Sequence, residues 1–255
     1  MTAWVGPPLV GHRLVVVAPH PDDEVLGTGG LMRWTAASGR DVVVVAVTDG
    51  EASHSRSARV TGLQLRRRRA EERAEALARL DVPATVISLG LPDQGCTRRR
   101  EDLVAELTDL LRSGDIIVGP AVGDRHPDHV AVASAISEAA PSVVDQWWEA
   151  PTWALVHGTA APASSTLILD ERAWWAKQHA MAAYRSQLVP LGPEPQDGPV
   201  VHPDELVAML RRNEEFASVT ERARTGREAG PASRTTGRAD DGQDTSSRPP
   251  QGVER

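Results

Sequence analysis

The sequence predicts an α/β domain in which a mostly parallel sheet is flanked by helices. Short apolar runs rich in β-branched residues alternate along the chain with longer segments of helical periodicity. Such runs are typical of strands buried on both faces, and a strand–helix–strand order favours parallel pairing. With 255 residues, the chain is long enough for one such domain with a substantial core.

The expected elements follow one another regularly through the first 140 residues. Strands are predicted at 14–18, 42–47, 85–89 and 116–118, and helices at 30–38, 63–80, 101–112 and 128–140. Beyond Pro141 the pattern is less regular, and we expect strands at 153–157 and 166–169 and helices at 172–187 and 203–216. Connections of this kind between parallel strands predict a Rossmann-like arrangement.

The composition changes near the C-terminus. From Glu221 to Arg255 the chain has no Leu, Ile, Met, Phe, Trp or Tyr, and Val253 is its only aliphatic residue larger than Ala. Such a segment cannot bury enough apolar surface to offset the entropy lost on ordering it. The expected division is therefore one folded domain over residues 1–220 and a disordered tail over 221–255.

Charge and cysteine content exclude several classes of protein. With 28 Lys+Arg against 35 Asp+Glu the net charge is −7, so we expect no nucleic-acid partner, which would require a basic face. The single cysteine, Cys96, allows no internal disulfide and fits a reducing, cytoplasmic compartment. Without a long apolar run or an export signal, no membrane partner is expected. The oligomeric state stays open.

Loops with acidic or histidine side chains follow four of the expected strands, at 19–24, 48–51, 90–93 and 125–129. In sheets of this class a ligand binds beyond the carboxyl ends of the strands. We therefore expect these four loops to lie on one rim. For a single loop, a plain turn with a fixed Pro and a capping Asp would be the simpler explanation.

The first and the last of these loops predict a metal site. Imidazole and carboxylate groups are suitable ligands for zinc, and a catalytic zinc usually has three protein ligands and one open position. His20, Asp23 and His129 could supply the three ligands if the two loops face each other. The expected metal is Zn²⁺, with Fe²⁺ as the alternative.

The remaining polar groups of these loops predict a metal-assisted hydrolase. Asp22 is left free to accept a proton from water that the metal activates. His126 is expected to stabilise the developing oxyanion as a protonated imidazole and then to donate to the leaving amine. Asp128 is expected to hold His126 in its charged form, although it could instead cap the helix that follows.

The two loops, P-H-P-D-D-E at 19–24 and H-P-D-H at 126–129, resemble the signature motifs of the PIG-L (LmbE-like) zinc-dependent de-N-acetylases. Segments between and after them agree, namely 48–54, 89–93 and 184–187. The resemblance implies that His20, Asp23 and His129 bind the metal, that Asp22 is the general base and that His126 polarises the amide carbonyl.

The resemblance also implies a substrate. Family members remove acetyl from N-acetylglucosamine-type sugars, and their substrate contacts fall at positions that match Glu51, Arg69 and Asp93. The expected activity is therefore hydrolysis of a linear amide: removal of an N-acetyl or other N-acyl group from an amino sugar, an amino-sugar conjugate or a glycosylated metabolite. Two alternatives remain, an amidase for a larger thiol–sugar conjugate of the mycothiol type and a non-catalytic binding module that keeps the fold.

Other features receive weaker assignments. Asp124 stands where the mycothiol-pathway enzyme carries a Tyr, and the Trp-rich second half looks more like actinobacterial relatives of unassigned substrate. The glycines at 27–30 lack the dinucleotide-binding spacing and are expected to let a helix pack closely on the sheet. The tryptophans, Trp153 among them, are expected in the core or at the rim more often than on a sugar face.

Overall fold

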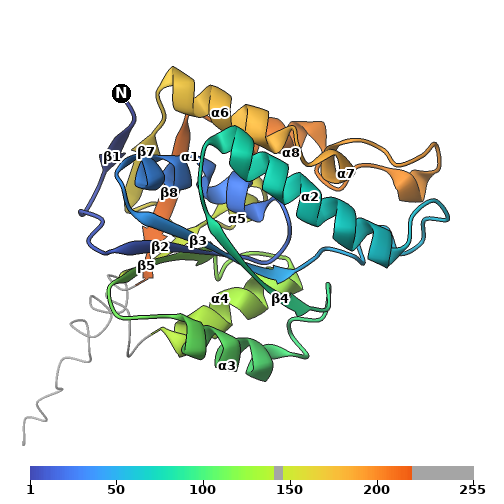
Figure 1. Ribbon diagram of the computed structural model, residues 1–255, viewed down its shortest axis with the longest axis horizontal. Helices are drawn as coiled ribbons and strands as arrows, with labels where there is room; N and C mark the ends of the chain where they lie inside the picture. Colours follow the sequence, from blue (N-terminus) through green and yellow to red (C-terminus); the bar gives the residue numbers. More distant parts are fainter. Residues whose placement is uncertain (141–145, 220–255) are drawn as a thin grey trace, which may run out of the picture.

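The computed structural model describes residues 1–140 and 146–219, so the tail predicted at 221–255 lies outside the described residues. At its centre is an eight-stranded sheet in the order β1-β7-β8-β6-β5-β2-β3-β4. Helices cover both faces of this sheet (Figure 1). The α/β class that the sequence predicts is confirmed.

Five neighbouring strands form the parallel half of the sheet. They are β6 (Gln146–Ala150), β5 (Asp115–Pro120), β2 (Arg13–Ala18), β3 (Asp41–Thr48) and β4 (Thr85–Leu91). The central strand β2 pairs with β3 on one side and with β5 on the other. The strand order therefore reverses between β2 and β5, which is the topological switch point where such sheets bind ligands. The loops that follow these two strands carry His20 and His126.

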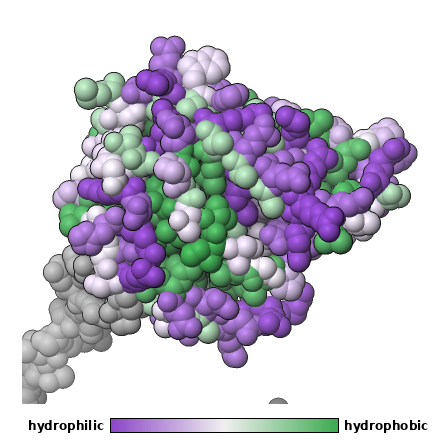
Figure 2. Space-filling view, in the orientation of Figure 1, coloured by the Kyte–Doolittle hydropathy of each residue, from purple (hydrophilic) through white to green (hydrophobic). Residues whose placement is uncertain are grey.

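Three further strands extend the sheet with antiparallel pairing. They are β8 (Asn213–Ser218), β7 (Ser165–Ile168) and β1 (Ala3–Val5), and they pair in the order β6·β8, β8·β7 and β7·β1. The other edge of the sheet is β4. Figure 2 shows hydrophobic side chains at this edge, between the polar surfaces of the two helix layers, and Val86 of β4 is 42% exposed.

Two helix layers sandwich the sheet (Figure 1). One layer contains α1 (Asp23–Ala37), α2 (Gly62–Leu80) and α6 (Glu171–Met181), with the short helices α5 (Thr152–Val156), α7 (Arg185–Leu188) and α8 (Pro203–Met209). The other contains α3 (Arg100–Leu110) and α4 (Pro127–Ala139). A 3₁₀ turn spans Pro195–Asp197. No helix of the described ranges combines the length and the hydropathy needed to cross a bilayer.

The strand β2 shows why the sheet is buried on both faces. Leu14 and Val16 belong to the apolar cluster under α1 and α2, whereas Val15 and Val17 belong to the cluster under α3 and α4. Side chains of a strand alternate between its faces, so a continuous run of apolar residues serves both clusters. This confirms the interpretation of the valine runs as doubly buried strands.

Several element boundaries differ from the prediction. Residues 153–156 lie in helix α5, with residue 157 as its C-cap, and the neighbouring strand is β6, while 213–216 form part of strand β8 and not of a helix. In β8 the buried Glu214 and Phe216 alternate with less buried residues, and pairing with β6 and β7 outweighs the helical preference of two glutamates. The expected helix at 172–187 is interrupted between α6 and α7.

Helix α1 begins at Asp23, seven residues before the predicted start at Gly30. Its interior glycines allow close packing, because a Cβ at Gly30 would lie 2.3 Å from Cδ2 of Leu169. The expectation that these glycines bring a helix close to its neighbours is confirmed. The early start also means that α1 follows directly on the loop that carries His20 and Asp22.

Candidate metal centre

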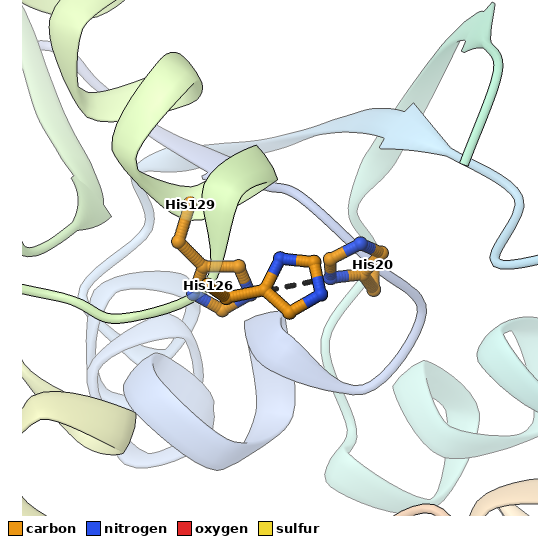
Figure 3. Close-up of side chains that lie close together, drawn as sticks. All are labelled: His20, His126 and His129. Carbon is orange, nitrogen blue, oxygen red and sulfur yellow. Dashed lines mark hydrogen bonds between the residues drawn. The ribbon is translucent and has the colours of Figure 1, made fainter. Parts of the chain in front are cut away.

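The loop after β2 and the first turn of α4 meet at the switch point. Figure 3 shows the rings of His20, His126 and His129 side by side, with centroids separated by 4.7 to 5.2 Å. Ligand atoms of these three histidines all lie within 4.8 Å of one another. The two loops that the sequence singles out therefore face each other, as the sheet order requires.

Three side-chain atoms form a tight triangle. His20 Nδ1 lies 3.2 Å from His129 Nε2, and Asp23 Oδ2 lies 3.4 Å from the first and 3.2 Å from the second. Ligands at zinc-bond lengths of about 2.0–2.1 Å in tetrahedral geometry are separated by about 3.3 Å. The triangle thus has the spacing of one face of a tetrahedral site, and two imidazoles with one carboxylate fit a divalent cation.

Carboxylates occupy the opposite nitrogens of both rings. Asp124 Oδ2 lies 3.0 Å from His129 Nδ1, and His20 Nε2 lies 3.3 Å from both Asp93 Oδ1 and Asp128 Oδ2. In metal sites a carboxylate on the far nitrogen fixes the tautomer and leaves the near nitrogen free to bind. Asp93 and Asp128 therefore contact His20, a position that the sequence did not suggest for them.

Sequence reasoning missed two residues that contact this triangle. Asp124 was assigned no role at the metal site. The signal that could have identified it is its position two residues before His126, because from there its Oδ1 accepts the backbone N–H of His126 at 2.9 Å. Trp153 donates from Nε1 to Asp23 Oδ1 at 3.0 Å. Trp153 lies in helix α5, directly after β6, and this position brings it to the site. Sequence reasoning missed it because a strand was expected at 153–157.

The charges at the site explain its pKa shifts. Burial opposes protonation of His129, but the charge of Asp23 and the hydrogen bond to Asp124 outweigh it and raise the pKa of His129 to about 9. Burial is likewise outweighed at His20, whose pKa is raised well above its usual value by Asp128, Asp23 and Asp93. Four carboxylates thus surround two imidazoles, an excess of negative charge that suits a cation.

Asp22 has an unusual backbone. Its φ is 121° and its ψ is −30°, in a region that costs a non-glycine residue about 1–3 kcal/mol. The side chain is 4% exposed and faces a cavity shared with His20 and His126. Burial, followed by the charge of Asp23, raises the pKa of Asp22 well above its usual value. Strain and a raised carboxyl pKa together are typical of functional sites.

The expected ion pair of Asp128 with His126 is wrong. The Asp128 carboxylate accepts the backbone N–H groups of Gln94 at 2.7 Å and Cys96 at 3.0 Å and lies 3.3 Å from Nε2 of His20, so its partners are these groups and not the His126 ring. His126 caps α4, where its Nδ1 accepts the backbone N–H of Asp128 at 3.2 Å. Burial, then the charges of His20 and His129, lowers the pKa of His126. The ring is therefore neutral, with its hydrogen on Nε2.

A cavity of about 530 Å³ opens from the metal triangle. Of the three predicted substrate contacts, Arg69 and Asp93 line it, whereas Glu51 is absent from the lining and accepts the backbone N–H of Asp93 at 3.2 Å. Residues without an assigned role also line it, namely His54, Trp153, His157, Gln187 and Gln196.

Arg69 is buried, and its guanidinium is held by protein groups. Nη1 donates to the carbonyl of Gly50 at 2.5 Å, Nη2 to Ser53 Oγ at 2.9 Å and Nε to Ser186 Oγ at 3.3 Å. These contacts join the loop after β3 to helix α7. Arg69 thus fixes the shape of one cavity wall as well as lining it.

Comparison with known proteins agrees with this geometry. Residues 15–140, which include both histidine loops, match the family described as PIG-L: GlcNAc-PI de-N-acetylase. A 1D-myo-inositol 2-acetamido-2-deoxy-alpha-D-glucopyranoside deacetylase from Corynebacterium diphtheriae is 27% identical, over 71% of this chain and 78% of its own. A diacetylchitobiose deacetylase from Thermococcus kodakarensis is 30% identical, over 46% and 45%.

The fold has solved counterparts as well. The N,N'-diacetylchitobiose deacetylase from Pyrococcus horikoshii superimposes with a TM-score of 0.61 at 19% identity, covering 82% of this chain and 84% of that one. The fold, the matched segment and the two histidine loops agree with one another, and residues 15–140 form a domain of the PIG-L family.

Proposed function

We propose that this chain is a metal-dependent deacetylase that hydrolyses the N-acetyl amide of an amino sugar or an amino-sugar conjugate. The observation that carries the proposal is the triangle of His20 Nδ1, Asp23 Oδ2 and His129 Nε2, with sides of 3.2 to 3.4 Å. The names of the relatives, deacetylases of an inositol-linked acetamido sugar and of diacetylchitobiose, support the reaction and the class of substrate.

His20, Asp23 and His129 would hold the metal, for which we propose Zn²⁺ with Fe²⁺ as the alternative. When bound, such a cation supplies Lewis-acid polarisation of a carbonyl and lowers the pKa of water. Asp124 supports this assignment from behind His129, and Asp93 and Asp128 support it from behind His20.

Asp22 would accept the proton of the attacking water and then give it to the leaving amine, because its carboxyl is buried next to the triangle and faces the cavity. His126 would donate a hydrogen bond from Nε2–H to the carbonyl oxygen as charge develops on it, since its Nδ1 already accepts an N–H. In this proposal His126 acts as a neutral donor. A neutral imidazole with its hydrogen on Nε2 is sufficient to bind the oxyanion in this way, so the ring does not have to be protonated.

The substrate would be a small molecule, an amino sugar or a conjugate of one. The cavity of about 530 Å³ falls within the range that holds drug-sized ligands. Arg69 and Asp93 would contact the sugar, and Glu51 would hold the Asp93 loop. We propose one catalytic domain over residues 1–220, acting in the cytoplasm, to which the single Cys96 is suited.

The test is a substrate panel with the full chain. Metal-free protein is reloaded with zinc or iron(II), and release of acetate and of free amine is followed on N-acetylated amino sugars, their glycosides and thiol conjugates. We expect deacetylation that a chelator abolishes and the metal restores. Exclusive cleavage of thiol conjugates would favour the amidase alternative. Full metal loading without any cleavage would favour the binding module and refute the proposed function.

A further inference from the structure

Asp22 is the most unusual backbone position among the non-glycine residues that the structure describes. Asp81 and Gln94 also have positive φ, but their values of 60° and 61° fall in the ordinary left-handed region. The φ of 121° at Asp22 lies well outside it. A residue stays in such a conformation only when its surroundings hold it there.

The peptide unit between Pro21 and Asp22 is held at both ends. Its carbonyl, on Pro21, accepts Nε2–H of Gln187 at 3.0 Å, and its N–H, on Asp22, donates to Glu24 Oε2 at 3.1 Å. The Asp22 carbonyl on the other side is held by the N–H groups of Val25 and Leu26, so fixing the plane of the preceding peptide fixes the rotation about the N–Cα bond of Asp22, which is φ. Both side chains that hold it are buried, Gln187 with 1% and Glu24 with 0% exposure.

Glu24 is itself held by two other segments. Its Oε1 accepts Nε–H of Arg73, on α2, at 3.0 Å and the hydroxyl of Tyr184, just before α7, at 2.5 Å. Arg73 is 4% exposed and Tyr184 is fully buried. One carboxylate oxygen is thus engaged by α2 and by the chain before α7, which leaves the other to accept the N–H of Asp22.

We propose that Glu24 and Gln187 are positioning residues, which aim the Asp22 carboxylate by gripping the Pro21–Asp22 peptide, with Arg73 and Tyr184 holding Glu24 in place. The proposal rests on the proposed function of Asp22. If φ relaxed to the negative values that L residues prefer, the Cα–Cβ bond would rotate and move the carboxylate away from its place beside the triangle. Displacements of about 1 Å can cost about 100-fold in rate.

The first measurement compares Glu24→Gln with a matched control, Glu214→Gln. Glu214 is 4% exposed, pairs with Lys177 at 2.6 Å and accepts the N–H groups of Gly30 and Leu31, so it is a second buried glutamate–cation pair bonded to α1. Both variants leave a buried cation unpaired. We expect Glu24→Gln to lower kcat about tenfold or more with KM within about threefold and metal content unchanged, and Glu214→Gln to keep kcat within about twofold.

A double-mutant cycle shows whether Glu24 acts through Asp22. In an Asp22→Asn background, Glu24→Gln should lower the residual rate by no more than about twofold, because the group that it aims is already gone. Tyr184→Phe, which removes only the hydroxyl, should give a smaller loss of kcat in the same direction. Equal losses in both backgrounds, or an equal loss in Glu214→Gln, would overturn the proposal.

A readout without substrate separates this proposal from the proposed function. In Glu24→Gln the single amide oxygen should stay with its two donors, Arg73 and Tyr184, which leaves an NH2 group that cannot accept opposite the Asp22 N–H. Hydrogen exchange of the Asp22 amide should therefore accelerate about tenfold or more in Glu24→Gln and stay unchanged in Glu214→Gln. Unchanged exchange in Glu24→Gln would refute the positioning role of Glu24, even if the enzyme is active. Accelerated exchange in a protein that cleaves no acetamide would support the positioning role and refute only the proposed deacetylase function.

Discussion

Asp124 Oδ2 lies 3.0 Å from Nδ1 of His129, on the side of the ring opposite to the nitrogen that faces Asp23 and His20. The carboxylate therefore fixes the tautomer in which Nδ1 carries the hydrogen and Nε2 has its lone pair free. It is also 2% exposed, so few water molecules compete for it. The proposed metal site thus depends on a residue that is not among its ligands.

Replacing Asp124 by Ala should weaken metal binding by about 10- to 100-fold, the usual effect of losing the carboxylate behind a ligating histidine. The measurement is competition with a chelator of known affinity. Asp109→Asn, at an exposed position on α3, serves as the control and should leave the affinity unchanged. A wild-type affinity in Asp124→Ala would show that His129 does not need this partner.

The neighbouring residues Asp22 and Asp23 should behave differently when each is changed to Asn. Asp23→Asn should lose the metal, because an amide replaces the only carboxylate in the triangle. Asp22→Asn should keep the metal and lose about 10²–10⁴-fold in kcat, the range for removal of a general base. Elemental analysis and rate measurements on the same samples check both. A rate within a few-fold of wild type in Asp22→Asn would exclude it as the base.

Metal affinity should rise with pH up to about 9. In the metal-free protein the pKa of His129 is raised to about 9. Below that pH the ring carries a proton that a metal must displace, so each unit of increase should tighten binding about tenfold for each proton released. Chelator competition at several pH values, together with calorimetry in buffers of different ionisation enthalpy, measures the affinity and the protons. An affinity that does not change between pH 6 and 8 would contradict the raised pKa.

The close approach of α1 to Leu169, the residue that follows β7, predicts a stability effect away from the site. Gly30→Ala would place a Cβ 2.3 Å from Cδ2 of Leu169 in the core, where overpacking costs about 1–3 kcal/mol. Gly29→Ala, the matched control, should cost less stability, since its Cβ would meet the aliphatic part of the Lys177 side chain at 3.3 Å. Denaturant unfolding should therefore rank Gly30→Ala below Gly29→Ala in free energy of unfolding. The reverse order would mean that Leu169 moves aside freely.

The parts of the site that sequence alone predicts are those fixed by strand order. The valine runs of β2 and β3 identify doubly buried parallel strands. The reversal of strand order between β2 and β5 brings the loop with His20 and the start of α4 with His129 together. Predicting that these two segments lie close together requires no knowledge of side-chain orientation, because their proximity follows from the sheet topology.

The parts that sequence could not predict depend on orientation or on late segments of the chain. Asp128 lies on the first turn of α4, and whether its carboxylate faces His126 or the loop at 94–96 is decided by the backbone N–H groups that this loop offers. Glu214 was expected in a helix at 203–216, but it lies in a strand, where Lys177 and the α1 backbone satisfy it inside the core. Such contacts join residues far apart in sequence, and no local pattern carries them.

Trp153 provides the last prediction, because its indole N–H holds the oxygen of Asp23 that lies outside the triangle. Trp153→Phe keeps an aromatic side chain but removes the indole N–H, and loss of this hydrogen bond should weaken metal binding by about 0.5–1.5 kcal/mol, or roughly 2- to 13-fold. The matched control is Trp174→Phe, since Trp174 donates from the same atom to the carbonyl of Leu210 at 2.8 Å. Chelator competition should distinguish the two variants, whereas an equal effect in both would mean that the loss arises from general destabilisation and not from Asp23.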